Sequence, residues 1–146
     1  MLPKIKNILY IESGFSFGGA VVCLAELIKK LNKDKYVPIS IFSQRDEITK
    51  NLMCQTKTPF LIIKRYRRSD HANILLNRLP DFIKKIFVIP IVLLEIFLGI
   101  PFLVKVVHTV KKQKVDIVHI NNCFWANTEV ILLMQLLKIP CIAQIR

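Results

Sequence analysis

A pair of glycines stands where an expected strand passes into an expected helix. Gly18 and Gly19 follow the short apolar run NILYIE (residues 7–12) and directly precede a segment with helical apolar spacing. Because glycine has no side chain, a ligand can approach its backbone closely, and the N-terminus of a helix favours an anion. We therefore expect the pair to contact a phosphate or another polar ligand. A tight turn that needs glycine only for its backbone is the alternative.

Polar residues near the end of a second apolar run are the next candidates. His119 lies in the run VDIVHI (residues 115–120), and Asn121 and Asn122 follow it. Open α/β sheets bind ligands at the carboxyl ends of their strands. Histidine can exchange a proton at neutral pH, whereas asparagine can only hydrogen-bond a hydroxyl group. The pattern makes His119 a catalytic candidate and the two asparagines substrate-binding candidates; a core histidine and turn-forming asparagines are the alternatives.

Three further residues can contact a ligand. Arg146 ends the last expected strand and can bind a phosphate, although it is also the last residue of the sequence. Phe124 and Trp125 can stack on a sugar, contact lipid, or simply cover the end of the sheet. Acidic residues and histidines form no group with the spacing of metal ligands, so we predict no metal site and no cofactor.

The apolar runs that position these residues alternate with helical patterns. Strands are expected at 7–12, 37–43, 60–63, 115–120 and 140–145, and helices at about 20–31, 46–53 and 127–137. Continuous apolar strands that alternate with helices predict a parallel sheet with right-handed crossovers. Residues 1–146 are long enough for a single domain. The four cysteines show no C-x-x-C pair and are expected to be small buried side chains in a reducing compartment.

Positive charge gathers around the most apolar stretch of the chain. The net charge is +12, and 11 of the 22 basic residues lie between Lys64 and Lys114, against three of the 10 acidic ones. Hydrophobic residues make up 53% of the sequence, and the mean hydropathy is +0.43. The chain therefore carries more apolar residues than the core of one domain of this size needs. This combination favours an anionic membrane surface as partner. The basic run 64–68 contains a single tyrosine, so no nucleic acid is predicted to bind.

Residues 86–104 form an apolar segment with one charge, Glu95, near its centre. As a helix it would be about 28 Å long, close to the thickness of a bilayer core. Glu95 and the interruptions expected at Pro90, Gly99 and Pro101 disfavour a crossing. A single crossing would also separate strands that share one sheet. We expect an in-plane or re-entrant segment at the inner face of the cell membrane in a cytoplasmic protein; a true span is the alternative.

Three segments, in order, resemble the N-terminal domain of glycosyltransferase family 4, which has the GT-B architecture. The first, NILYIESGFSFGGA, is similar to the family's opening strand and its Gly-Gly pair. The second, KKQKVDIVHINN, is similar to a basic helix end followed by a strand with a His-containing turn. The third, LLKIPCIAQIR, is similar to a passage from a helix into a strand. The resemblance covers nearly the whole chain, with a loose fit over residues 64–104. It implies a Rossmann-like sheet of about five parallel strands, ordered 3-2-1-4-5, with helices on both faces. It also implies that this domain is truncated.

The resemblance also implies an activity. Such enzymes move a sugar from a nucleotide-sugar donor to an acceptor, here a lipid-linked or surface-polysaccharide acceptor, and the Gly18-Gly19 loop would lie near the acceptor and the donor phosphates. Their second domain grips the donor through a Glu-x7-Glu motif, and no two glutamates of this sequence stand eight apart. Several family members carry a second histidine where this chain has Asn121, which leaves an acid/base role for His119 without support. We therefore expect an acceptor-side half that is inactive alone.

Three other interpretations remain open. A non-catalytic, membrane-associated module can pair with a separate donor-binding chain. A truncated gene product would leave the edge of the fifth strand exposed and prone to aggregation. A small membrane protein with a single span is the third.

Overall fold

The structure falls into two compact units. The computed structural model describes residues 5–14, 17–43, 46–65, 80–121 and 127–144, without the side chains of 81–89, 91–93 and 95–96. One unit combines Met1–Lys64 with Val107–Arg146, and the other is Arg65–Val106. The sheet and every sequence-based site candidate belong to the first unit, whereas the apolar segment 86–104 belongs to the second.

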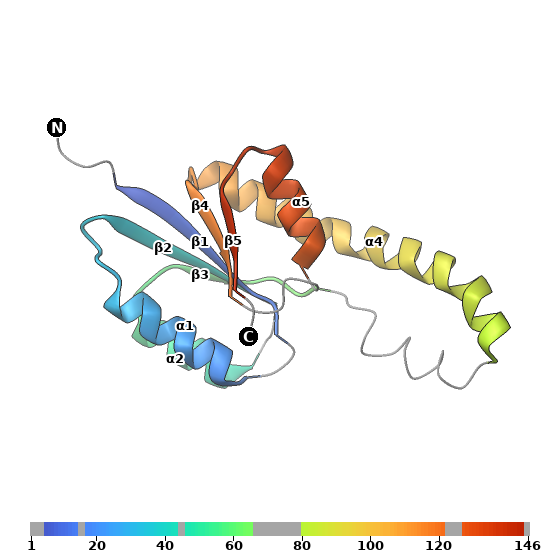
Figure 1. Ribbon diagram of the computed structural model, residues 1–146. Coiled ribbons are helices and arrows are strands. Elements are labelled where there is room, and N and C mark those ends of the chain that lie inside the picture. The colour runs from blue at the N-terminus through green and yellow to red at the C-terminus, as the bar shows by residue number, and fades with distance from the viewer. Residues whose placement is uncertain (1–4, 15–16, 44–45, 66–79, 122–126, 145–146) are drawn as a thin grey trace. The chain divides into compact units, whose positions relative to one another are not determined.

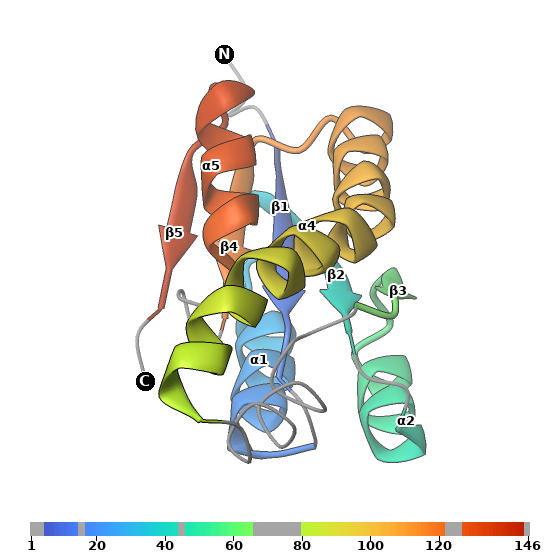
Figure 2. The same ribbon diagram turned by 90° about the vertical axis from the view of Figure 1, so that its right-hand side faces the viewer.

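Five parallel strands form a single sheet in the order β3-β2-β1-β4-β5 (Figure 2). These strands are β1 (Lys6–Glu12), β2 (Tyr36–Phe42), β3 (Phe60–Ile62), β4 (Ile117–Ile120) and β5 (Cys141–Ala143). All four neighbouring pairs are parallel, which confirms the Rossmann-like α/β fold and its strand order. The chain leaves β1 toward β2 on one side and returns beside β1 as β4 on the other. The carboxyl ends of β1 and β4 therefore form a topological switch point.

Helices cover both faces of this sheet. Helices α1 (Gly19–Lys30) and α2 (Glu47–Gln55) lie on one face, and α5 (Thr128–Leu136) lies on the other (Figure 1). Between the sheet and the first two helices, buried apolar side chains form a core: Ile8, Tyr10, Val21, Leu24, Ala25, Ile28, Phe42 and Met53. The core holds the ends of β1 and the start of α1 in fixed positions.

The apolar segment lies within one long helix, α4 (Asp81–Lys112), which has 32 residues. We expected Pro90, Gly99 and Pro101 to interrupt this helix, and that expectation was wrong, because α4 continues through all three. A proline removes only one backbone hydrogen bond, and the long helical flanks on both sides make the remaining ones. Among the described residues, no helix has the length and hydropathy needed to cross a membrane.

The cysteines differ from the expectation of burial. Cys23 and Cys54 are exposed and Cys141 is partly buried, while Cys123 lies outside the described residues. The inner side of α1 is made by Val21, Leu24 and residues one turn further on, so Cys23 faces outward. Helical spacing, rather than the usual preference of cysteine for the interior, decides its exposure.

Candidate functional site

The switch point carries polar side chains where each central strand ends. Glu12 is the last residue of β1 and Ser13 follows it, while Asn121 follows β4. Their exposures are 0%, 1% and 1%, so all three are buried despite their polarity. Buried polar groups need hydrogen-bond partners to offset the loss of water. The partners link two strands and two helices, so we call Glu12, Ser13, Asn121 and Asn127 the switch-point network.

On the face covered by α1, Glu12 and Asn121 join three elements. The backbone N–H of Gly14 donates to Glu12 Oε1 at 2.8 Å, and Asn121 Nδ2 donates to Glu12 Oε2. The same Nδ2 also donates to the carbonyl oxygen of Ala20, in the first turn of α1, at 2.9 Å. The two hydrogens of one amide group therefore fix the end of β4 to β1 and to the start of α1.

On the opposite face, Ser13 makes the corresponding link to α5. Asn127 Nδ2 donates to Ser13 Oγ at 2.7 Å, and both side chains are buried. Asn127 is the N-cap residue of α5, yet its side chain makes no capping hydrogen bond to that helix. The asparagine positions the start of α5 against the end of β1 instead.

The glycine pair begins α1, beside this network. Gly18 is the N-cap residue with an extended backbone (φ −170°), and Gly19 is the first helical residue. No described glycine has a positive φ, and a Cβ added at Gly19 would meet no atom within 4 Å. The backbone therefore does not require glycine at position 19. The first turn of α1 has no side-chain capping hydrogen bond and no acidic residue. A ligand can therefore approach the backbone N–H groups there.

His119 lies on the side of the sheet that carries α1, next to Tyr10. The two residues are paired in the register of β1 and β4, and their ring centroids are 5.3 Å apart in an edge-to-face arrangement. Tyr10 belongs to the core, and burial raises the pKa of its hydroxyl above the usual 10.0. His119 is itself partly buried. This environment is that of a packed aromatic side chain, and a role of His119 in proton transfer stays a prediction.

The structure brings together some of the residues singled out in the sequence. Gly18, Gly19 and Asn121 converge through the contact of Asn121 with Ala20, and His119 lies two residues earlier on β4. Asn122 and Arg146 lie outside the described residues, as do Phe124 and Trp125. Within the described chain, no group of three or more histidine, cysteine or acidic side chains has the geometry of a metal site.

Sequence reasoning missed Glu12, Ser13 and Asn127. Glu12 and Asn121 are separated by 109 residues, and Ser13 and Asn127 by 114, so only the pairing of β1 with β4 brings them together. A signal was nevertheless present for Glu12. A carboxylate at the end of a continuous apolar strand, directly before Ser-Gly, is unusual, since charged residues are rarely buried without partners.

The electrostatics of the site follow from Glu12. Its carboxylate shares a donor nitrogen with the carbonyl oxygen of Ala20, so it lies beside the first turn of α1. An anionic group there interacts favourably with the positive end of the helix dipole. Gly19, at the same end of α1, is exposed.

Comparisons of this chain with known protein families, with curated proteins and with solved structures find no match. The Rossmann-like fold and the switch-point network therefore stand on the structure alone.

Proposed function

We propose that this chain is the acceptor-side half of a glycosyltransferase related to family 4, acting on a lipid-linked or surface-polysaccharide acceptor at the inner face of the cell membrane. In this reaction the acceptor hydroxyl oxygen bonds to the anomeric carbon of the donor sugar, and its proton passes to water. The bond from that carbon to the diphosphate breaks, and the nucleoside diphosphate leaves with the electron pair. Donor binding is assigned to a second domain or chain, so the half alone is inactive.

The observation that carries the proposal is the open first turn of α1 at the switch point. Gly19 has room for a side chain and an ordinary backbone, so conformational need does not explain a glycine there. Switch points of open parallel sheets are where such folds bind ligands. Asn121 and Glu12 give this corner a fixed geometry, because their hydrogen bonds tie β1, β4 and α1 together.

Access distinguishes the residues that position the site from those that touch the acceptor. Asn121 is 1% exposed and its amide nitrogen is engaged by Glu12 and Ala20, so it acts as a positioning residue in this proposal. The backbone at Gly18 and Gly19 is the surface that the acceptor contacts. A diphosphate of a lipid-linked acceptor suits the N–H groups at a helix N-terminus.

One observation favours a second candidate, a non-catalytic module that pairs with a donor-binding chain. The described polar side chains at the strand ends, Glu12, Asn121 and His119, are all buried or partly buried within the fold. A module that only binds acceptor needs no exposed acid or base. Both candidates share the binding site at Gly19.

Calorimetric titration with a water-soluble probe, geranyl-diphosphate-linked N-acetylglucosamine, tests the site. Gly19→Leu fills the open space and should weaken binding by about tenfold or more without loss of stability. Gly99→Leu is the matched control, since a Cβ at Gly99 also meets nothing within 4 Å, and it should bind as the unmodified chain does. Equal binding by both variants, or no binding by the unmodified chain, contradicts the proposal.

A further inference from the structure

One side of α4 exposes a row of apolar side chains. Within the second unit, the described exposed residues of this helix include Leu94 (56%), Phe97 (69%) and Val104 (58%). Together with Pro90 and Pro101 they recur at steps of three and four residues, which places them along one stripe of a helix. We call this stripe the outer face of α4; it comprises Pro90, Leu94, Phe97, Leu98, Ile100, Pro101 and Val104.

The opposite side of the helix is less exposed. Phe102 is 2% exposed, and the guanidinium carbon of Arg65 lies 5.1 Å from the centroid of its ring. Val106, one turn further on, is fully buried. The outer face is therefore not the side on which α4 packs. From Pro90 to Val104 it is about 21 Å long at the usual rise of a helix, and contiguous exposed apolar surface of this kind marks an interaction site.

The charges around the stripe indicate its partner. Lys105 directly follows Val104 and is exposed, and the helix ends with Lys111 and Lys112 in its last turn. An apolar stripe bordered by lysines matches a bilayer whose surface is anionic: the stripe enters the boundary between headgroups and acyl chains, and the lysine ammonium groups reach the phosphates.

We propose that the outer face of α4 docks in the plane of an anionic lipid bilayer. Burial of the apolar side chains provides attachment, and the lysines select anionic lipid over zwitterionic lipid. This inference rests on α4 alone and does not depend on the sugar-transfer proposal.

Flotation of the full chain with lipid vesicles tests the inference. Vesicles of phosphatidylcholine containing phosphatidylglycerol should carry the protein upward, and vesicles of phosphatidylcholine alone should carry much less. Phe97→Gln combined with Val104→Gln should weaken binding at least about tenfold, because two apolar side chains leave the lipid. The matched control combines Ile48→Gln and Leu136→Gln, which alter exposed apolar residues of α2 and α5 (59% and 80% exposed) and should bind normally.

The charge component has its own pair of variants. Lys111→Gln combined with Lys112→Gln should reduce binding to anionic vesicles, and salt near 1 M, where the Debye length is about 3 Å, should reduce it as well. The matched control is Lys29→Gln with Lys30→Gln, the basic residues in the last turn of α1. Equal binding to both kinds of vesicle would overturn the assignment of anionic lipid.

Two further results would overturn the docking itself. One is failure of the unmodified chain to float with anionic vesicles. The other is self-association in the absence of lipid that Phe97→Gln with Val104→Gln abolishes, measured by sedimentation velocity, because the outer face would then bind a second copy of the chain.

Discussion

Asn121 connects three elements with a single amide group. Its Nδ2 donates to the Glu12 carboxylate and to the Ala20 carbonyl oxygen, and its backbone N–H donates to the carbonyl oxygen of Ile11 at 3.0 Å. The residue was expected from its type and place to contact ligand. Its burial makes it the joint between β1, β4 and α1, and ligand contact by this residue stays a prediction. The partners of its side chain could not be predicted from the sequence, because strand pairing decides them.

Removal of this joint should destabilise the fold. Asn121→Ala removes one hydrogen-bond donor from Glu12 and one from the carbonyl oxygen of Ala20 at a buried position, so we expect the free energy of unfolding to fall by about 3 kcal/mol. Urea denaturation measures the change. Asn51→Ala, at an exposed position of α2, should shift it by no more than about 0.5 kcal/mol. Similar effects of the two substitutions would contradict the role given to Asn121.

Two buried serines should respond in opposite directions to the same substitution. Ser40 Oγ in β2 is buried and, in the described part of the chain, is the only such side-chain oxygen or nitrogen without a hydrogen-bond partner. Ser40→Ala should leave stability unchanged or raise it by about 1 kcal/mol, since an unpaired hydroxyl is removed. Ser13→Ala should lower it by about 1 to 3 kcal/mol, because the hydrogen bond from Asn127 Nδ2 to Ser13 Oγ is lost at a buried position. Thermal unfolding of both variants measures the two effects. Destabilisation by Ser40→Ala would contradict the assignment of Ser40 Oγ as an unpaired buried hydroxyl.

Two weak acids, the buried Tyr10 and the partly buried Cys141, should make the protein less stable at alkaline pH. Burial raises the pKa of the Cys141 thiol above its usual 9.0 and that of the Tyr10 hydroxyl above 10.0. The folded state then holds these protons more tightly than the unfolded state does, so the contribution of the two groups to stability is present below their usual pKa values and is lost as the pH rises through the raised ones. Urea denaturation at increasing pH should show a shallower fall for Tyr10→Phe combined with Cys141→Ala. If stability fell equally steeply with pH in the double variant and in the unmodified chain, these two groups would not cause the loss of stability.

At the scale of elements, apolar runs predicted strands well because parallel strands are buried on both faces. Every expected strand is present, displaced by a few residues at most. Helix α4 was predicted less well. Its start at Asp81, directly after Pro80, and its passage through Pro90 and Pro101 did not follow from the sequence pattern. Local penalties of proline were overridden by a long stretch of otherwise helical residues.

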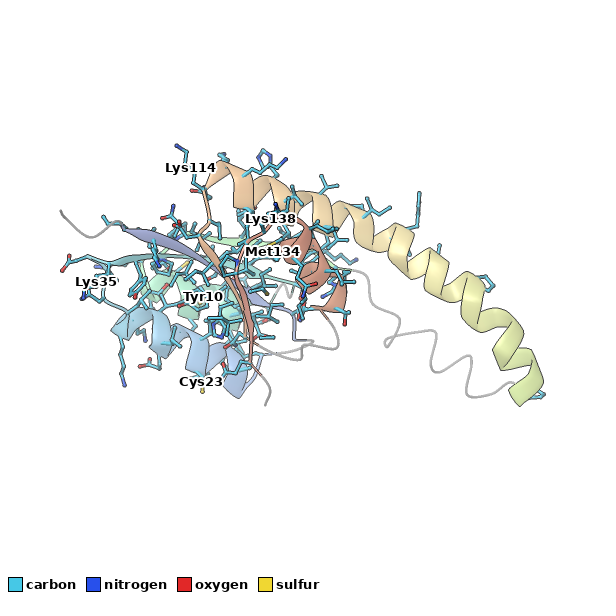
Figure 3. The ribbon with its side chains drawn as sticks, turned by 45° about the horizontal axis from the view of Figure 1, so that its top comes forward. Tyr10, Cys23, Lys35, Lys114, Met134 and Lys138 are labelled. Carbon is cyan, nitrogen blue, oxygen red and sulfur yellow. The ribbon has the colours of Figure 1, made fainter. Side chains whose placement is uncertain are left out.

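The helix ends show a second feature that residue types alone conceal. Lys57, Lys114 and Lys138 follow α2, α4 and α5 with positive φ values of 54°, 48° and 56°. Glycine is the usual residue there, because other residues are strained in the left-handed region. Lys114 and Lys138 lie at the junctions that lead into β4 and β5 (Figure 3). The backbone N–H of Val115 donates to the carbonyl oxygen of Val110 at 3.0 Å, which closes the end of α4.

Relief of this strain should stabilise the protein. Lys114→Gly should raise the free energy of unfolding by about 1 kcal/mol, because glycine adopts a φ of 48° without cost. Lys33→Gly, in the exposed turn before β2, is the control; Lys33 is not among the described residues with positive φ, so the change should destabilise slightly. Chemical denaturation of both variants measures the difference. A loss of stability in Lys114→Gly would contradict the strain assigned to Lys114 at the end of α4.

At the scale of the whole molecule, the alternation of strands and helices predicted the Rossmann-like sheet and its switch point. The candidate site was predicted only in part. Gly18, Gly19 and Asn121 were found from their types and positions, whereas Glu12, Ser13 and Asn127 needed contacts across more than 100 residues. The sugar-transfer proposal and the membrane-docking proposal rest on different elements, α1 and α4, and each can fail without the other.

The most direct test of the central claim is an NMR titration of the ¹⁵N-labelled full chain with geranyl-diphosphate-linked N-acetylglucosamine, with geraniol, which lacks the diphosphate and the sugar, as control. The account predicts that the sugar-bearing probe shifts the amide signals of Gly18, Gly19 and Ala20, and that Gly19→Leu abolishes these shifts. The absence of shifts at the start of α1, or shifts confined to the outer face of α4, would contradict it. In the latter case the chain would bind the lipid tail and not the acceptor.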